Sequence, residues 1–270
     1  MADLERYANK YENCKLERRD GVLQVTLHTG GGPFAFSEPA HHDLGLLFYD
    51  ISDDPENKVV ILTGSGDRFC ADFDFGSFMG VLGRNHAEGT YRIRNDGRRM
   101  LAAFLDIDIP VIAAINGPVV AHSELPLLAD VVLATEDTFF QDATHFMIGA
   151  VPGDGVHTVW TTLLGLNRGR YFLLTGQKIA AREALDLGVV GEVLPRESLL
   201  TRAWELAQHW ARLPRPTLSS TRHALTYEWK RLFTQQLHNG LTEEMLAGAF
   251  STPPEIDPKT IPPVDLLAGR

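Results

Sequence analysis

The sequence has few cysteines and no long apolar run. Only Cys14 and Cys70 occur among its 270 residues, too few for a disulfide scaffold and too scattered for a thiolate metal site. No stretch reaches the roughly 18 apolar residues that a membrane span needs, and the first residues lack the apolar segment of a signal peptide. We therefore expect a cytoplasmic protein without disulfides and without a membrane partner.

Positive charge is also scarce. Lys and Arg total 25 against 35 Asp and Glu, which gives a formal net charge of -10. This charge would repel phosphate backbones, and the one Arg-rich segment, at 92–99, is interrupted by Asp96. We therefore expect no nucleic-acid partner. The content of 44% hydrophobic and 22% charged residues is instead typical of a packed globular protein.

Apolar patterning predicts alternating strands and helices. Three short runs are typical of strands buried on both faces: "KVVILTGSG" at 58–66, "IPVIAAING" at 109–117 and "DVVLATE" at 130–136. Helical spacing at 41–52 and an Arg-rich helical stretch at 86–106 separate them. Strands that alternate with helices indicate an α/β protein with crossover connections.

The pattern changes near residue 205. Before it, strands and helices are mixed, whereas "RPTLSSTRHALTYEWKRLFTQQLHNGLTEEMLAGAF" is almost wholly helical in pattern. Residues 251–270 are rich in proline. We expect an α/β core over 1–205 and a helical region with an irregular tail over 206–270.

Four motifs then follow one another in a characteristic order. They are "VVILTGSGDRFCADFDF", "IPVIAAINGPVVAHSELPLLADVVLATEDTFF", "GAVPGDGVHTVW" and "LLTGQKIAAREALDLGVVGEVLP". Across roughly residues 20–200 this order resembles the crotonase (enoyl-CoA hydratase/isomerase) superfamily. The resemblance implies a spiral of ββα repeats, a C-terminal α-helical trimerisation region, and assembly as a homotrimer or a dimer of trimers.

The chain departs from the superfamily at positions that carry its usual chemistry. Crotonases hold a thioester enolate with two backbone N–H groups in glycine-rich turns. Here Asp72 replaces a glycine of the first turn and leaves Phe73 as the backbone donor, while His122 stands in the second turn. The slot of one hydratase glutamate holds His145, and Glu124 matches the other.

A further departure concerns coenzyme A. Asp67 stands where crotonases often have a Lys or Arg that helps to hold the CoA phosphates, and a carboxylate there would repel them. Together with "AHSELP", "FQDATHF" and "VPGDG", these departures resemble the β-diketone hydrolase branch of the superfamily. The resemblance implies hydrolysis of a carbon–carbon bond in a cyclic β-diketone by a retro-Claisen route, with no cofactor and no metal.

The resemblance also implies the site. Its catalytic positions fall on His122, His145 and Asp154, and its substrate-binding or orienting positions fall on His41, Glu244 and the aromatic Phe36. As further walls of the substrate pocket we expect Phe73 and Trp160.

Histidine suits the activation of water, because its ordinary pKa of about 6.5 lets it accept a proton near neutral pH. We assign His145 as this base, with Asp154 on its far ring nitrogen to fix the tautomer. His122, in the former oxyanion turn, is placed to donate a hydrogen bond to a carbonyl or enolate oxygen.

Other interpretations stay open. The chain can be a CoA-dependent hydratase or isomerase that uses Glu124, a binding protein with a crotonase fold, including an RNA-binding one, or the holder of a metal among its histidines. Asp154 can be a turn residue, His41 part of a helix cap, and Glu244 part of a solvated helix face.

Overall fold

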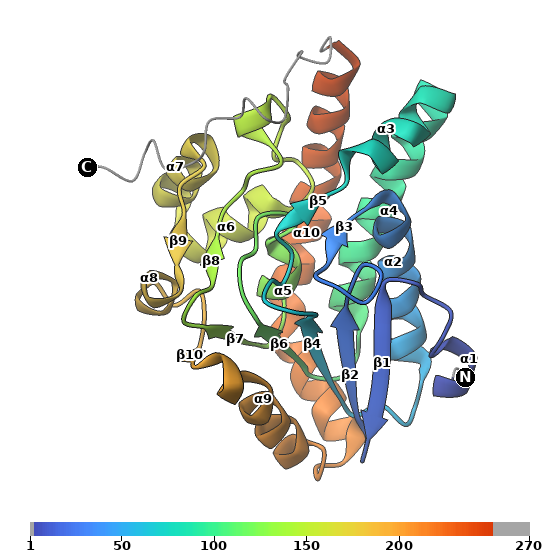
Figure 1. Ribbon diagram of the computed structural model, residues 1–270, viewed down its shortest axis with the longest axis vertical. Coiled ribbons are helices and arrows are strands. Elements are labelled where there is room, and N and C mark those ends of the chain that lie inside the picture. The colour runs from blue at the N-terminus through green and yellow to red at the C-terminus, as the bar shows by residue number, and fades with distance from the viewer. Residues whose placement is uncertain (1–2, 251–270) are drawn as a thin grey trace.

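A six-stranded sheet forms the base of the molecule in the computed structural model, which describes residues 3–250 (Figure 1). Its strands, in spatial order, are β1 (Cys14–Arg19), β2 (Val22–Leu27), β4 (Val59–Gly64), β6 (Val111–Ile115), β7 (Val131–Thr135) and β10 (Glu192–Leu194). β1 and β2 are antiparallel, and every other neighbouring pair is parallel. The three apolar runs predicted as buried strands are β4, β6 and β7, so the α/β prediction is confirmed.

Short strands form a second layer of pairing. They are β3 (Ala35–Phe36), β5 (Asp72–Phe73), β8 (Phe139–Phe140) and β9 (Ile179–Ala180). β3 pairs with β5 in parallel, and Val119 bridges Cys70 on one side and Phe140 on the other. The chain thus passes repeatedly from a long strand to a short pairing and then to a helix, as in β2, β3 and α2. This is the expected spiral of ββα repeats.

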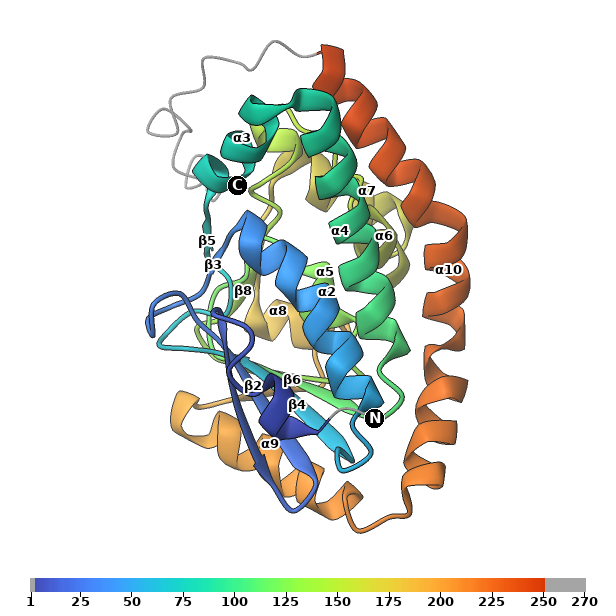
Figure 2. The ribbon, with the colours of Figure 1, turned by 90° about the vertical axis from the view of Figure 1, so that its right-hand side faces the viewer.

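Helices cover both faces of the sheet. They are α1 (Leu4–Tyr7), α2 (Glu38–Asp53), α3 (Phe75–Arg84), α4 (His86–Asp106), α5 (Glu124–Leu127), the 3-10 helix η1 (Phe146–Ile148), α6 (Val156–Leu164), α7 (Leu166–Thr175), α8 (Ala181–Asp186), α9 (Arg196–Trp210) and α10 (Arg215–Phe250). α2 and α4 lie together above the sheet, and α9 lies beneath it (Figure 2). Because successive strand residues point to opposite faces, β4 packs Ile61 against Leu199 of α9 while Leu62 joins the core on the other face.

Arg222 anchors α10 to the rest of the fold. Its side chain is fully buried, forms an ion pair with Asp130 at 2.9 Å, and donates to the carbonyl oxygens of Phe104 and Ile107. The helical C-terminal region is therefore confirmed. α10 runs along the length of the molecule beside α4 (Figure 2).

The composition change expected near residue 205 lies inside α9, which runs from Arg196 to Trp210. α9 covers the sheet with small residues such as Ala203 and Ala207. The boundary between the two expected regions therefore stays a prediction. The tail expected over 251–270 lies outside the described residues, and the trimer stays a prediction.

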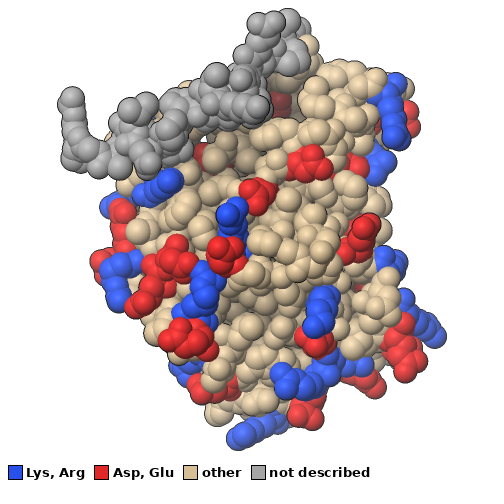
Figure 3. Space-filling model, viewed as in Figure 1, with Lys and Arg blue, Asp and Glu red and all other residues tan. Residues whose placement is uncertain are grey.

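Two features of the described residues concern membrane-spanning helices and surface charge. No helix within residues 3–250 is both long and apolar enough to cross a membrane. On the face seen in Figure 3, basic and acidic side chains are interspersed and form no continuous basic patch.

The turn that enters α6 meets α10 backbone to backbone. A Cβ atom on Gly153 would lie 2.1 Å from the carbonyl oxygen of Gly240, and one on Gly240 would lie 2.4 Å from the ring of His157. Only glycine allows such an approach, so the two glycines fix the position of the next residue, Asp154.

Substitution of Gly240 tests this contact. Gly240→Ala should lower the free energy of unfolding by about 1–3 kcal/mol or more, since the added methyl group has no space. Gly248→Ala, in the same helix and free of any described atom within 4 Å, should keep or raise stability, because alanine favours a helix over glycine by about 1 kcal/mol. Thermal unfolding followed by circular dichroism compares the two variants, and equal midpoints would contradict the close packing.

Candidate active site

A cavity of about 270 Å³ opens where the loops after the short strands meet α3, α4 and α10. Its walls are mostly apolar, with Phe73, Phe75 and Phe78 on one side and Leu241 and Met245 of α10 on another. Its volume lies near the small end of ligand pockets, which are roughly 300–1,000 Å³. The polar residues predicted from the sequence all line it: His41, His122, His145, Asp154 and Glu244.

His145 lies between two carboxylates. Its Nε2 is 3.2 Å from Oδ2 of Asp154, and its Nδ1 is 2.7 Å from Oδ1 of Asp142. The contact between His145 and Asp154 is therefore present, but Nε2 makes it; the other ring nitrogen, Nδ1, where Asp154 was expected, contacts Asp142 instead. Asp142 was missed in the sequence, although it stands three residues before His145 in the motif "FQDATHF" and that spacing was the available signal.

The two carboxylates determine the charge of the His145 ring. A neutral imidazole carries one N–H group, whereas donation to both carboxylates requires the doubly protonated ring. Burial would lower the pKa of His145, but the charges and hydrogen bonds of Asp154 and Asp142 raise this pKa well above its ordinary value of 6.5. The two contacts therefore favour the doubly protonated form of His145.

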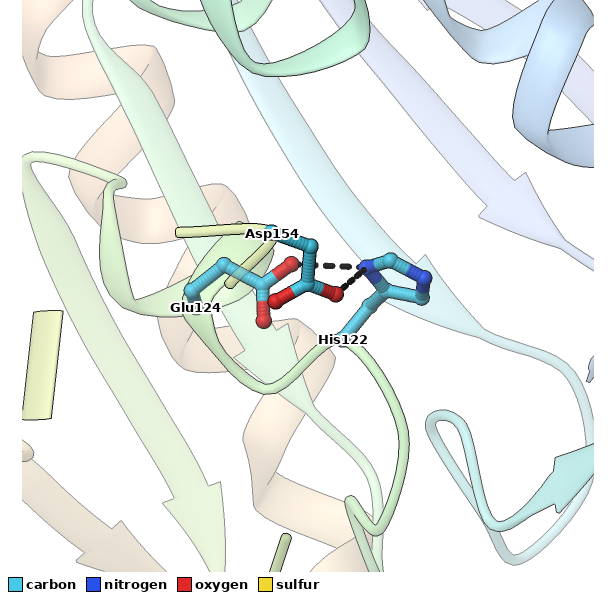
Figure 4. A group of neighbouring side chains, drawn as sticks. All are labelled: His122, Glu124 and Asp154. Carbon is cyan, nitrogen blue, oxygen red and sulfur yellow. Dashed lines mark hydrogen bonds and ion pairs between the residues drawn. The ribbon is translucent and has the colours of Figure 1, made fainter. Parts of the chain in front are cut away.

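His122 is bonded on one ring nitrogen only. Its Nδ1 lies 2.7 Å from Oε1 of Glu124 and 3.4 Å from Oδ2 of Asp154, whereas Nε2 is directed away from both carboxylates (Figure 4). Burial lowers its pKa and the charges of Glu124 and Asp154 raise it, with a net rise. His122 can therefore donate from Nε2 into the cavity while Nδ1 is held by its acidic neighbours.

The backbone of His122 has a left-handed conformation. Its φ angle is 45°, in the left-handed region that residues with a Cβ atom rarely adopt. Such strain typically costs about 1–3 kcal/mol and persists where the surrounding structure holds it. Here the ring of Phe36 packs against the imidazole, with 3.9 Å between the ring centres.

Asp154 connects the two histidines. One of its oxygens, Oδ2, faces both His145 and His122, and the other accepts a hydrogen bond from the backbone N–H of Val156 at 3.3 Å. Burial alone would raise the pKa of Asp154, but the charges of His145 and His122 lower it. The carboxylate is thus ionised and shared.

Glu244 and His41 also line the cavity. Burial and the charge of Asp154 raise the pKa of Glu244 to about 8, and burial lowers the pKa of His41 to about 3. Oε2 of Glu244 and Nδ1 of His41 are buried and make no hydrogen bond within the described residues. At neutral pH both side chains are therefore largely uncharged parts of the cavity wall.

The aromatic predictions have mixed outcomes. Phe73 lines the cavity, whereas Phe36 lies behind His122 and is not part of the lining. Trp160 was expected in a wall, and this is wrong. It is fully buried on the inner side of α6, stacks on Phe172 with 4.1 Å between ring centres, and donates to Ser123 at 2.8 Å. Through Ser123, Trp160 therefore helps to hold the turn that carries His122.

Three side chains come close enough together to hold a metal ion. Atoms of His122, Glu124 and Asp154 lie within 4.8 Å of one another (Figure 4). When Nδ1 of His122 is protonated and donates to Glu124 across the 2.7 Å contact, it has no lone pair to offer a metal.

The local charges also bear on coenzyme A. The guanidinium of Arg68 lies 3.6 Å from Asp67 and 3.3 Å from Asp72. Because two carboxylates neutralise this cation, the segment offers little attraction to phosphate groups.

A buried imidazole–carboxylate cluster at the loop ends of a ββα spiral defines an enzyme of the crotonase superfamily. The sequence pattern of the enoyl-CoA hydratase/isomerase family matches residues 17–251, and the chain belongs to this family.

Three proteins illustrate what the chain is similar to. A carnitinyl-CoA dehydratase from Salmonella enteritidis is 31% identical over 198 residues, which are 73% of this chain and 74% of that protein. Among solved structures, a β-diketone hydrolase from the cyanobacterium Anabaena, bound to (S)-3-oxocyclohexyl acetic acid, is 45% identical with a TM-score of 0.86, and the match covers 89% of this chain and 96% of that one. An enoyl-CoA hydratase/isomerase from Mycobacterium paratuberculosis is 25% identical with a TM-score of 0.80, over 87% and 93% of the chains.

The strained turn gives a test at His122. Glycine relieves the left-handed backbone and alanine does not, so His122→Gly should be more stable than His122→Ala by on the order of 1 kcal/mol. Urea unfolding of the two variants measures the difference. Equal stabilities would show that the turn relaxes once the imidazole is gone.

The buried carboxyl of Glu244 gives a pH test. Its pKa rises from 4.5 to about 8 on folding, so its stabilising contribution is present below pH about 4.5 and is lost as the pH rises through about 8. Glu244→Gln cannot titrate, so between about pH 5 and about pH 8 its free energy of unfolding should fall less than that of the unaltered protein. Urea unfolding at both pH values measures this, and equal falls would contradict the buried, protonated state.

Proposed function

We propose that the protein hydrolyses a carbon–carbon bond of cyclic β-diketones, a retro-Claisen cleavage that yields a keto acid. The observation that carries the proposal is His145, which occupies the slot of a hydratase glutamate and shares Asp154 with His122 at the cavity. The likeness to the Anabaena β-diketone hydrolase supports it. The reaction uses neither a cofactor nor a metal in this proposal.

The first step is the attack of water. Once Nε2 of His145 has lost its proton, a water molecule in the cavity can donate one hydrogen to Nε2 and the other to Asp154. As the water oxygen bonds to one carbonyl carbon, its proton passes to Nε2, and Asp154 stabilises the imidazolium that forms. Negative charge develops on the carbonyl oxygen, which accepts a hydrogen bond from Nε2 of His122.

The second step breaks the carbon–carbon bond. When the tetrahedral intermediate collapses, the electrons of this bond pass to the neighbouring carbon and are delocalised as an enolate onto the second carbonyl. The proton on Nε2 of His145 then moves to that carbon. One water molecule is consumed, the ring opens, and a carboxylic acid and a ketone remain in one product. His41 and Glu244, both uncharged in the cavity, can hold the second carbonyl.

CoA-thioester hydration fits this site poorly. Glu124, the remaining hydratase position, is fully buried, is bonded to His122 and is not among the residues that line the cavity. It is therefore unavailable to activate water for a substrate there. Arg68, which follows Asp67 in the segment expected to hold the CoA phosphates, is paired with two carboxylates.

A substrate panel tests the proposal. Monocyclic and bicyclic 1,3-diketones, supplied without CoA, should lose their ultraviolet absorbance as they open to keto acids, while crotonyl-CoA should not be hydrated. His145→Ala should lower kcat by about 10²–10⁴, because the base is gone. His209→Ala, at an exposed position of α9, is the matched control and should be unaffected. Hydration of crotonyl-CoA without cleavage of any diketone would overturn the proposal.

A further inference from the structure

Asp142 contacts the site through His145 alone. Its carboxylate is buried and is not among the residues that line the cavity, so it is out of reach of a substrate. One oxygen accepts from Nδ1 of His145 at 2.7 Å, and the other has no hydrogen-bond partner within the described residues. The bond to His145 is the one hydrogen bond that the structure shows for this carboxylate.

We propose that Asp142 is a positioning residue that selects the working tautomer of His145, by holding the proton on Nδ1 and leaving Nε2 as the nitrogen that gives and takes protons at the cavity. This inference rests on the proposed function, in which His145 is the base. It moves the tautomer-fixing role of the acid in a Ser-His-Asp triad from Asp154 to Asp142.

The reason lies in the position of Asp154. Asp154 faces Nε2, the nitrogen that must be free to accept a proton from water. If Asp154 were the only acid, a neutral His145 would place its proton on Nε2 to donate to it, and the lone pair would be on Nδ1, away from the cavity. Asp142 reverses this preference because its contact, at 2.7 Å, is shorter than the 3.2 Å contact to Asp154. The proton that leaves the imidazolium is therefore the one on Nε2.

The backbone holds Asp142 rigidly in this place. The N–H groups of Gln141 and Ala143, on either side, donate to the carbonyl oxygens of Val119 and Val120 at 3.0 and 3.1 Å. Val119 and Val120 belong to the loop that leads into His122. The loop that leads to His122 and the segment that carries His145 are therefore hydrogen-bonded to each other, and Asp142 lies between the two residues that make these bonds.

Other titratable groups surround the ring, and none of them can replace Asp142. Asp154 faces Nε2, and the charges of His122, His157 and Glu244 also interact with His145. Within the described residues, Asp142 is the only one of these groups with an ion-pair contact to Nδ1.

Nuclear magnetic resonance tests the tautomer without any substrate. In protein labelled with ¹⁵N histidine, the neutral form of His145 should carry its proton on Nδ1, and in Asp142→Asn the proton should shift toward Nε2. Asp130→Asn is the matched control, because Asp130 is a largely buried carboxylate that pairs with Arg222 far from the ring. It should leave the His145 signals unchanged. A proton on Nε2 in the unaltered protein would overturn the inference.

Kinetics with a cleaved diketone give the second readout. Asp142→Asn should lower kcat and kcat/KM together with KM nearly constant, and an Asp→Asn change of this kind costs about 10⁴ in a catalytic triad. The acidic limb of the rate should also move to lower pH, because one of the two carboxylates that hold the ring proton is neutralised.

The Asp130→Asn control distinguishes the loss of a positioning contact from a loss of protein stability. Asp130→Asn should lower stability and leave the acidic limb in place. If the unaltered protein cleaves diketones and Asp142→Asn keeps both its rate and its pH profile, the positioning role is wrong and the proposed function stands. If the unaltered protein cleaves none while its His145 carries the Nδ1 proton, the proposed function fails and the tautomer assignment stands.

Discussion

The active site depends on one shared carboxylate. Oδ2 of Asp154 lies 3.2 Å from Nε2 of His145 and 3.4 Å from Nδ1 of His122, so a single oxygen joins the two imidazoles. Asp142 and Glu124 close the ends of this row, each at 2.7 Å from a ring nitrogen. Three carboxyl groups alternate with two imidazoles in this buried row. Each carboxylate therefore lies beside an imidazole that can carry the opposite charge, and their attraction offsets the cost of removing both from water.

The fold supplies the positions of these groups. Each turn of the spiral ends in a short strand and a loop, and the loops that follow Val119 and β8 lie side by side through backbone hydrogen bonds. Asp154 arrives from a third loop, which packs on α10 through Gly153 and Gly240 with no side chain between them. A fold that serves thioester chemistry in its relatives therefore brings two imidazoles together once a glycine turn carries His122 and a glutamate slot carries His145.

Motif order and spacing carried the resemblance to the family, and that resemblance implied the ββα spiral and the polar residues that line the cavity. The rest depends on packing. Trp160 faces inward because the register of α6 is set by Phe140 and Phe172, which no local pattern reveals. Asp142 was visible in its motif, but only the backbone pairing of its neighbours with the Val119 loop shows that it faces Nδ1 of His145.

A crystal structure with a bound keto-acid product tests the central claim most directly, since the product carboxylate marks where water attacked. The account predicts one carboxylate oxygen within hydrogen-bond distance of Nε2 of His122 and the other beside Nε2 of His145 and Asp154. A product held in the same cavity with its carboxylate away from both histidines would contradict it.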